Sequence, residues 1–152
     1  MNQNNQLNVL KKIDLCYRDV SGKYLYSPNG VHDRYVWLDQ EAPYSILAHD
    51  SEQDPVFMYA NHCALQCFKY CREDILRLPS RLSASPSDRA ERQKLLESVA
   101  FEGIATGYTG PRIDSMGQIF TIYNGEIWQL RDENNIVWGQ AALFWPYPKP
   151  AV

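Results

Sequence analysis

Three cysteines recur at a spacing of four residues, at Cys63, Cys67 and Cys71. If this segment is one regular helix, the three thiols lie along one stripe, since residues four apart share a helix face. Such a stripe could sense redox state or bind a soft metal. A structural zinc site needs further ligands elsewhere, and Cys16 is the one cysteine left over. We therefore expect the stripe to pack as small apolar side chains, and we predict no metal site.

Two arginines are the charged residues that most suggest a ligand: Arg81, in the segment LPSRLSA, and Arg112, in GPRI. A guanidinium that points into a cavity offers a planar set of donors that fits a carboxylate or a phosphate. The other arrangement is an internal ion pair, which we favour because a buried arginine is normally paired. The acidic residues that could pair with them are Glu73, Asp74, Asp88 and Asp114.

Aromatic and amide side chains on the expected strands could complete a binding site. An aromatic wall with a few polar groups is typical of small-ligand sites, although a plain aromatic core has the same composition. The predicted ligand-binding residues are Tyr59, Arg81, Tyr108, Arg112, Trp128 and Gln140.

The sequence contains no recognisable catalytic motif. It has no serine in a nucleophile elbow, no HExxH and no glycine-rich phosphate loop after a strand. The adjacent carboxylates of Glu73 and Asp74 lie at an expected helix start, where acidic residues are favourable without any catalytic role. We predict no catalytic residues and a protein that is not an enzyme, and the sequence identifies no cofactor.

The elements that must position these residues follow from hydrophobic periodicity and from helix-start signals. Asn61 is a good N-cap after a short buried strand, and Ser85-Pro86-Ser87-Asp88 carries a cap residue with proline at the first helical position. The expected helices are Gln6–Ser21, Val31–Asp39, His62–Cys71, a short segment from Cys71 to Leu78, and Ser85–Phe101. The expected strands are Tyr44–His49, Pro55–Ala60, Ala105–Ile113, Gln118–Leu130 and Ile136–Phe144.

This order predicts an α+β fold. Two strands, a helical crossing and a three-strand meander form one five-stranded antiparallel sheet, with the intervening helices on one face. The predicted organisation is an N-terminal helical flank over 1–43, the sheet domain over 44–147 and an extended tail over 148–152. A length of 152 residues suits one domain.

Several segments resemble, in order, the MEKHLA domain family: DPVFMYAN, LPSRLSA, the ER and KLL of the long helix, GY-G-RI, and GQAA. The resemblance covers roughly residues 40–146 and is weaker in the N-terminal helices. It implies a PAS-like fold, whose members sense ligands, redox state, oxygen or light, or serve as dimerisation modules. It implies no particular ligand. The residues around Cys63 do not reproduce the Asn-Cys-Arg-Phe-Leu-Gln context of light-sensing flavin domains.

One segment departs from the family pattern. Tyr123-Asn124-Gly125-Glu126 stands where related sequences are more apolar. A glycine inside a strand pattern indicates a bulge or a kink, so we expect the fourth strand to be irregular at Gly125.

Charge and hydropathy limit the possible partners. The formal net charge is −3 and no basic stripe is present, which argues against direct nucleic-acid binding. No apolar run approaches the roughly 20 residues of a membrane span. The polar N-terminus lacks the order of a signal peptide, so we expect a cytoplasmic protein with free thiols.

The function that we predict from the sequence is that of a PAS-like sensory or regulatory domain. It would bind a small organic ligand between sheet and helices and signal by contact with another protein. The alternative is a ligand-free module that forms a homodimer through the helix at Gln6–Ser21. A small enzyme on the same scaffold is a third class.

Overall fold

A computed structural model describes residues 3–84 and 88–150 of the chain. The helices are α1 (Gln3–Ser21), α2 (Arg34–Gln40), α3 (His62–Phe68), α4 (Arg72–Ile75), the 3₁₀ helix η1 (Ser80–Ser83) and α5 (Arg89–Glu102). The strands are β1 (Ser45–Asp50), β2 (Phe57–Ala60), β3 (Ile104–Ile113), β4 (Ile119–Arg131) and β5 (Val137–Trp145). The start signal expected at Ser85-Pro86-Ser87 lies outside the described residues.

The five strands form one antiparallel sheet in the order β2-β1-β5-β4-β3. The first and last strands in sequence, β1 and β5, therefore lie side by side near the middle of the sheet. The predicted α+β class and five-stranded sheet are confirmed. None of the helices within the described residues combines the length and apolar composition that a bilayer span requires.

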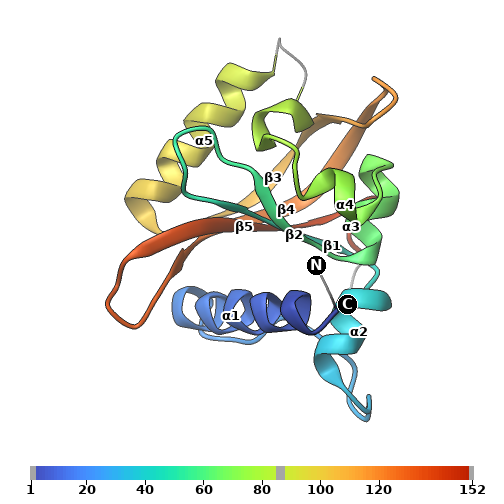
Figure 1. The fold of residues 1–152 in the computed structure, drawn as a ribbon, viewed down its shortest axis with the longest axis vertical. Helices are drawn as coiled ribbons and strands as arrows, with labels where there is room; N and C mark the ends of the chain where they lie inside the picture. Colours follow the sequence, from blue (N-terminus) through green and yellow to red (C-terminus); the bar gives the residue numbers. More distant parts are fainter. Residues whose placement is uncertain (1–2, 85–87, 151–152) are drawn as a thin grey trace.

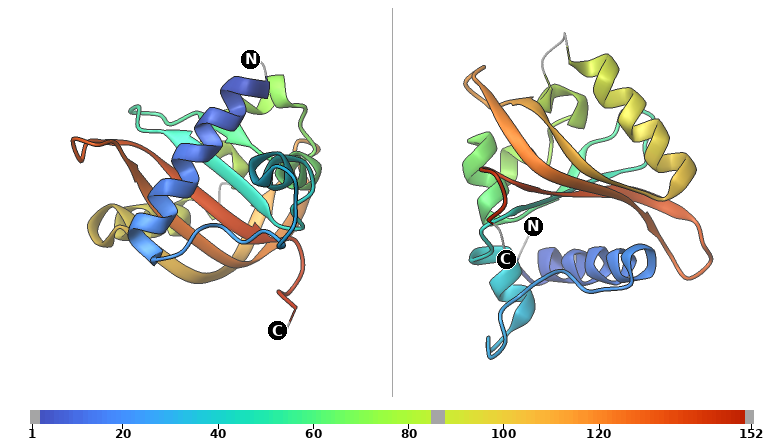
Figure 2. Two further views of the ribbon diagram at one scale, coloured as in Figure 1. Left: turned by 90° about the horizontal axis from the view of Figure 1, so that it is seen from below. Right: turned by 180° about the vertical axis from the view of Figure 1, so that it is seen from behind.

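Helices cover both faces of the sheet, as Figure 1 shows with the sheet seen nearly edge-on. Helices α1 and α2 lie on one face, and α1 crosses the strands obliquely (Figure 2). Helices α3, α4 and α5 lie on the other face. We call these the α1 face and the α5 face. The core of the α1 face includes Leu10, Ile13, Tyr17, Ile46 and Trp128, all buried.

Asn61 joins three elements at the point where β2 ends. Its Oδ1 accepts from the N–H groups of Ala64 (3.1 Å) and Ile46 (3.0 Å), so it caps α3 and also holds β1. Its Nδ2 donates to the carbonyl oxygens of Leu38 (2.9 Å) and Tyr44 (3.0 Å). A buried amide with these four partners fixes α3 and the end of α2 against the sheet.

Helix α3 ends three residues earlier than expected. Lys69 follows it in the left-handed conformation, with φ 59°, and closes the helix by donating its N–H to the carbonyl of Leu65. The predicted helix to Cys71 is therefore wrong, because a left-handed residue reverses the chain direction. Cys71 instead precedes α4 and is exposed, so only Cys63 and Cys67 share a helix face.

The strand pairing shifts register at five places, and two of these shifts bear on which face the side chains near them point to. The pairing of β1 with β2 shifts between Ala48 and His49, and the pairing of β4 with β5 shifts between Tyr123 and Glu126. At the second, Asn124 has φ 52°. The prediction of an irregular strand at Gly125 is confirmed.

Candidate ligand cavity

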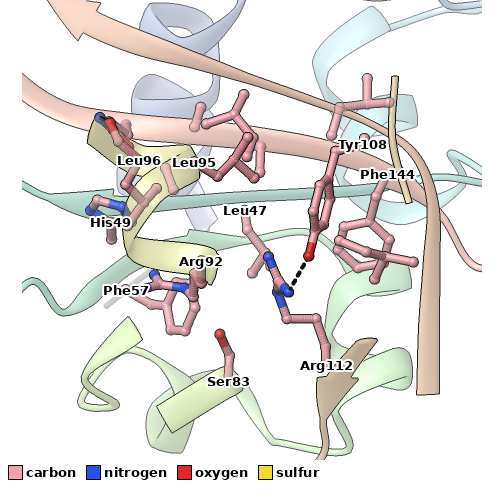
Figure 3. Close-up of a pocket in the computed structure, with 18 of the residues that line it drawn as sticks. Leu47, His49, Phe57, Ser83, Arg92, Leu95, Leu96, Tyr108, Arg112 and Phe144 are labelled. Atoms are coloured by element: carbon pink, nitrogen blue, oxygen red, sulfur yellow. Dashed lines mark hydrogen bonds between the residues drawn. The ribbon is translucent and has the colours of Figure 1, made fainter. Parts of the chain in front are cut away.

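A small cavity lies between the α5 face of the sheet and the helices that cover it. Its volume is about 60 Å³. The side chains around it come from β1, β2, β3, β4, β5, α3, η1 and α5, and Figure 3 shows how they converge. The apolar part of the wall includes Leu47, Phe57, Phe68, Leu95, Ile122 and Phe144.

Two buried arginines stand in this apolar wall. Arg92 comes from α5 with 8% of its surface exposed, and Arg112 comes from β3 with 7% exposed. Arg92 donates from Nη2 to Ser80 Oγ (2.8 Å). Arg112 donates from Nη1 to Tyr108 Oη (3.0 Å) and to the carbonyl of Pro111 (2.6 Å). Among the described residues no carboxylate lies within 4.0 Å of either guanidinium, although five ion pairs occur elsewhere.

The two guanidiniums affect each other electrically. Burial and, after it, the positive charge of Arg112 together lower the pKa of Arg92 to about 10. Both effects disfavour the charged form of a base. Arg92 remains protonated at neutral pH, so the apolar space holds two cations that have no carboxylate partner in the described part of the chain. The Arg112 guanidinium also lies over the Tyr108 ring, 5.1 Å from its centroid.

An outer groove of about 460 Å³ shares His49, Arg92, Leu96 and Gln140 with the cavity. Two buried polar atoms at this junction, His49 Nε2 and Gln140 Oε1, have no hydrogen-bond partner among the described residues. His49 donates from Nδ1 to the carbonyl of Asp50 (2.8 Å), and burial lowers its pKa below the usual value. Unsatisfied polar atoms beside a cavity are acceptors available to a ligand or to water.

Three of the six predicted site residues line the cavity. Tyr108 and Arg112 project from β3, and Gln140 projects from β5, where its amide nitrogen donates to the carbonyl of Leu96 (3.4 Å). The structure brings these three side chains together around one space. Their role in ligand binding stays a prediction.

Tyr59 and Trp128 lie on the α1 face, so the expectation that they frame the cavity is wrong. The Tyr59 hydroxyl donates to Asp39 Oδ1 (2.6 Å), and the Trp128 ring lies 4.7 Å from the ring of Tyr17. The physical reason for Tyr59 is the shift between β1 and β2, because it pairs Ala48 with Tyr59 but His49 with Phe57. Phe57 then faces the cavity, and Tyr59, two residues later, faces the other way.

Arg81 lies at the surface, beside the outer groove. It forms an ion pair with Asp54 (3.1 Å), and about half of each side chain is exposed. The favoured ion-pair arrangement therefore exists for Arg81, with an acid outside the set expected from the sequence. For Arg112 that arrangement is absent among the described residues, which differs from the expectation.

Arg92 and His49 are titratable cavity residues that were not among the site residues predicted from the sequence. Arg92 shares a helix face with Leu95, Leu96 and Val99, at spacings of three, four and seven residues. A single charge inside the apolar stripe of an amphipathic helix was the available signal. His49 ends β1, and its orientation depends on the irregular pairing there.

Cys63 and Cys67 form a separate polar cluster with Ser45. The two sulfurs lie 3.4 Å and 3.7 Å from Ser45 Oγ. Hydrogen bonding with Cys67 lowers the pKa of Cys63 to about 7. Residues 3–84 and 88–150 contain no group of three His, Cys, Asp or Glu side chains placed to hold a metal ion.

Solved structures identify the fold as that of a PAS domain. The PAS domain of a protein from Colwellia psychrerythraea matches with a TM-score of 0.64 and 19% identity, over 73% of this chain and 91% of that one. A light-oxygen-voltage domain studied with a flavin analogue matches with a TM-score of 0.57 and 20% identity, over 66% and 74%. A variant of Vivid matches with a TM-score of 0.60 and 12% identity, over 90% and 98%.

A model of the MEKHLA domain matches residues 8–148. The chain therefore belongs to the MEKHLA domain family, as its motifs indicated. The match begins inside α1, upstream of the segment that carries those motifs. Among curated proteins none matches the sequence.

Proposed function

We propose that the protein is a sensory or regulatory domain that binds one small organic molecule in the cavity of the α5 face. The observation that carries this proposal is a buried cavity with charged and polar groups that the protein leaves uncompensated. Folded proteins normally satisfy buried polar groups internally, so a cluster of unsatisfied ones is an expected mark of a binding site.

The size of the cavity limits what can enter it. About 60 Å³ accommodates a group of a few heavy atoms, well below the roughly 300–1,000 Å³ of pockets for drug-sized ligands. The rest of a larger ligand would occupy the outer groove past His49 and Gln140. A bulky planar cofactor would require the walls to move apart.

Strands β1 and β5 could transmit the effect of ligand binding to the opposite face of the sheet. Consecutive residues of β5, 140–144, border the cavity, and two of them, Ala141 and Leu143, also belong to the core under α1. A ligand that shifts β5 therefore alters the packing of α1, because close-packed interiors transmit small displacements. Signal output would pass from α1 or the sheet to another protein. The proposal assigns no chemical reaction to the domain.

Native mass spectrometry of protein purified without added ligand tests the proposal. We expect a bound small molecule in the wild type and its loss in Ala142→Leu, which fills the cavity with a longer side chain. The matched control is Ala90→Leu, the same change at an exposed position of α5. A wild-type protein that carries no adduct and is not stabilised by any compound of a metabolite library would contradict the proposal.

The homodimer remains the alternative function, and the structure changes how it must be tested. Leu10, Ile13 and Tyr17 of α1 are buried against the sheet of the same chain. Deleting residues 1–22 would expose this core, so loss of a dimer after that deletion would be uninformative. Light scattering of the full chain and of a Leu15→Glu variant is the sharper test, since Leu15 is exposed on α1.

A further inference from the structure

We propose that the ligand is an organic monocarboxylic acid whose carboxylate lies between Arg92 and Arg112 and whose hydrocarbon part begins among the apolar cavity residues and, in a longer acid, extends into the outer groove. The inference rests on the proposed function, because it names the chemical class of ligand for that same cavity. Four observations support it.

The first observation is convergence. Arg92 and Arg112 come from elements that are distant in the sequence, α5 and β3, and both reach into the space next to Ser83 (Figure 3). Long cationic side chains near a protein surface normally turn outward to water. Here both are more than nine-tenths buried, so the fold holds two positive charges where a ligand would contact both.

The second observation is spare donor capacity. A guanidinium has five N–H donors and no acceptor. Within the described part of the chain, hydrogen bonds use Nη2 of Arg92 and Nη1 of Arg112. Every acceptor in these bonds is a neutral oxygen, from Ser80, Tyr108 or Pro111. Donors therefore remain on both side chains, and the acceptor that would neutralise them is an anion.

The third observation is the electrostatic state of the ligand-free cavity. Two cations in an apolar wall repel each other, and the lowered pKa of Arg92 reflects this repulsion together with burial. Removing charges from water without pairing them is unfavourable. One carboxylate between them replaces a repulsion by two attractions, so an acid should stabilise the folded protein strongly for its size.

The fourth observation concerns shape and polarity. Beyond the two arginines the wall consists largely of Leu, Ile and Phe side chains, which suit hydrocarbon. A planar carboxylate offers two oxygens, one for each guanidinium, and fits a cavity of about 60 Å³. A phosphate would bring additional strongly hydrated oxygens into the same apolar space, where they would lack partners.

Calorimetric titration of the full chain with matched acids and amides tests the inference. The probes are hexanoate and benzoate, their uncharged amides hexanamide and benzamide, and inorganic phosphate. We expect the acids to bind at least about tenfold more tightly than the amides, because the amides forgo the charge-assisted bonds. Amides that bind as tightly as the acids would overturn the carboxylate assignment and leave the proposed small-molecule function intact. Phosphate that binds more tightly than both acids would overturn the carboxylate assignment in favour of a site for an inorganic oxyanion.

Two variants assign the effect to the arginines. Arg92→Gln and Arg112→Gln should each weaken hexanoate binding at least about tenfold and leave hexanamide binding within about twofold. Arg77→Gln is the matched control, since it removes the same charge from an exposed position. Without ligand, both cavity variants should melt at or above the wild-type temperature, because each removes the repulsion.

Unchanged affinity in these variants would contradict the inference. If both glutamine variants retain wild-type affinity for hexanoate, the carboxylate does not lie between the arginines and the inference fails. Wild-type protein that binds none of the four organic probes also overturns it, and the native mass measurement then decides the proposed function separately. A variant that fails to fold leaves the acid-to-amide ratio of the wild type as the deciding measurement.

Discussion

The two faces of the sheet differ in the partners of their buried charges: the carboxylates on the α1 face have charged partners, whereas the two guanidiniums on the α5 face have none among the described residues. On the α1 face, Asp14 accepts from the N–H of Leu25 (2.8 Å), from Arg34 Nη1 (2.5 Å) and from the hydroxyl of Tyr35 (3.0 Å). Asp39 has comparable partners. On the α5 face, the hydrogen bonds of Arg92 and Arg112 to the other described residues go only to neutral oxygens. The same chain therefore satisfies its buried acids and leaves its buried bases open.

The difference separates a structural charge from a functional one. A buried carboxylate with three donors locks two helices and a loop into one arrangement. The buried guanidiniums form hydrogen bonds to neutral oxygens, and Arg112 also stacks over the Tyr108 ring (5.1 Å), but no counterion among the described residues offsets their loss of hydration. Their burial therefore suggests a role other than stability. The comparison predicts that charge removal lowers stability on the α1 face and not on the α5 face.

The largest expected effect is the loss of Asp14 as an acceptor. Asp14→Asn should lower the free energy of unfolding by about 3–5 kcal/mol, because the charge of Arg34 then remains half-buried without its partner. Urea unfolding measures the change. Asp19→Asn, an exposed position on the same helix, is the control and should be nearly neutral. A loss below about 1 kcal/mol for Asp14→Asn would remove the contrast between the two faces.

Packing gives a second test, with adjacent residues of β5. Ala141 and Ala142 both border the cavity, but only Ala141 is also part of the core of the α1 face. Ala141→Leu should cost about 1–3 kcal/mol, since added methylenes strain a close-packed core. Ala142→Leu should cost much less, because it enters existing space. Equal losses in urea unfolding would mean that the α5 face is packed as tightly as the α1 face.

Much of the fold could be predicted from sequence, since its signals are local. The Asn61 cap, the succession of helices and strands along the chain and the irregularity at Gly125 depend on residue types at fixed spacing. The cavity depends on pairing between distant strands, which leaves no local signal. Ile122 and Ile127 both line the cavity although they are five positions apart, an odd spacing that would put them on opposite faces of a regular strand.

The lack of a local signal for strand pairing also explains why some site residues were predicted in the wrong place. Tyr59 was predicted as a site residue because it is an aromatic residue on a strand expected to frame the cavity, and the shift in pairing between β1 and β2 turns it to the other face. Arg92 was missed because a charge on an amphipathic helix is ordinarily attributed to the solvent-facing side. Recognising it required knowing which face α5 turns to the sheet.

The pH dependence of stability tests the junction between cavity and groove. Burial lowers the pKa of His49, so the unfolded chain binds a proton that the folded protein does not. Stability should therefore fall as the pH drops below about 6.5, the ordinary histidine pKa, and then level off below the lowered value. The charge of Arg92 works in the same direction and that of Asp50 opposes it. His49→Asn should flatten this part of the profile, measured as melting temperature between pH 5 and 8. An unchanged slope would mean that other groups cause it.

The smallest expected effect concerns Arg81, which separates a surface arginine from the two buried ones. Its ion pair with Asp54 is about half exposed on both sides, so water and salt already screen it. Arg81→Gln should change the free energy of unfolding by less than about 1 kcal/mol and leave hexanoate affinity unchanged. Calorimetry on Arg81→Gln beside Arg112→Gln checks both expectations in one series. If Arg81→Gln weakened acid binding as much as Arg112→Gln, the carboxylate would lie in the outer groove, and burial would not be what selects the binding arginines.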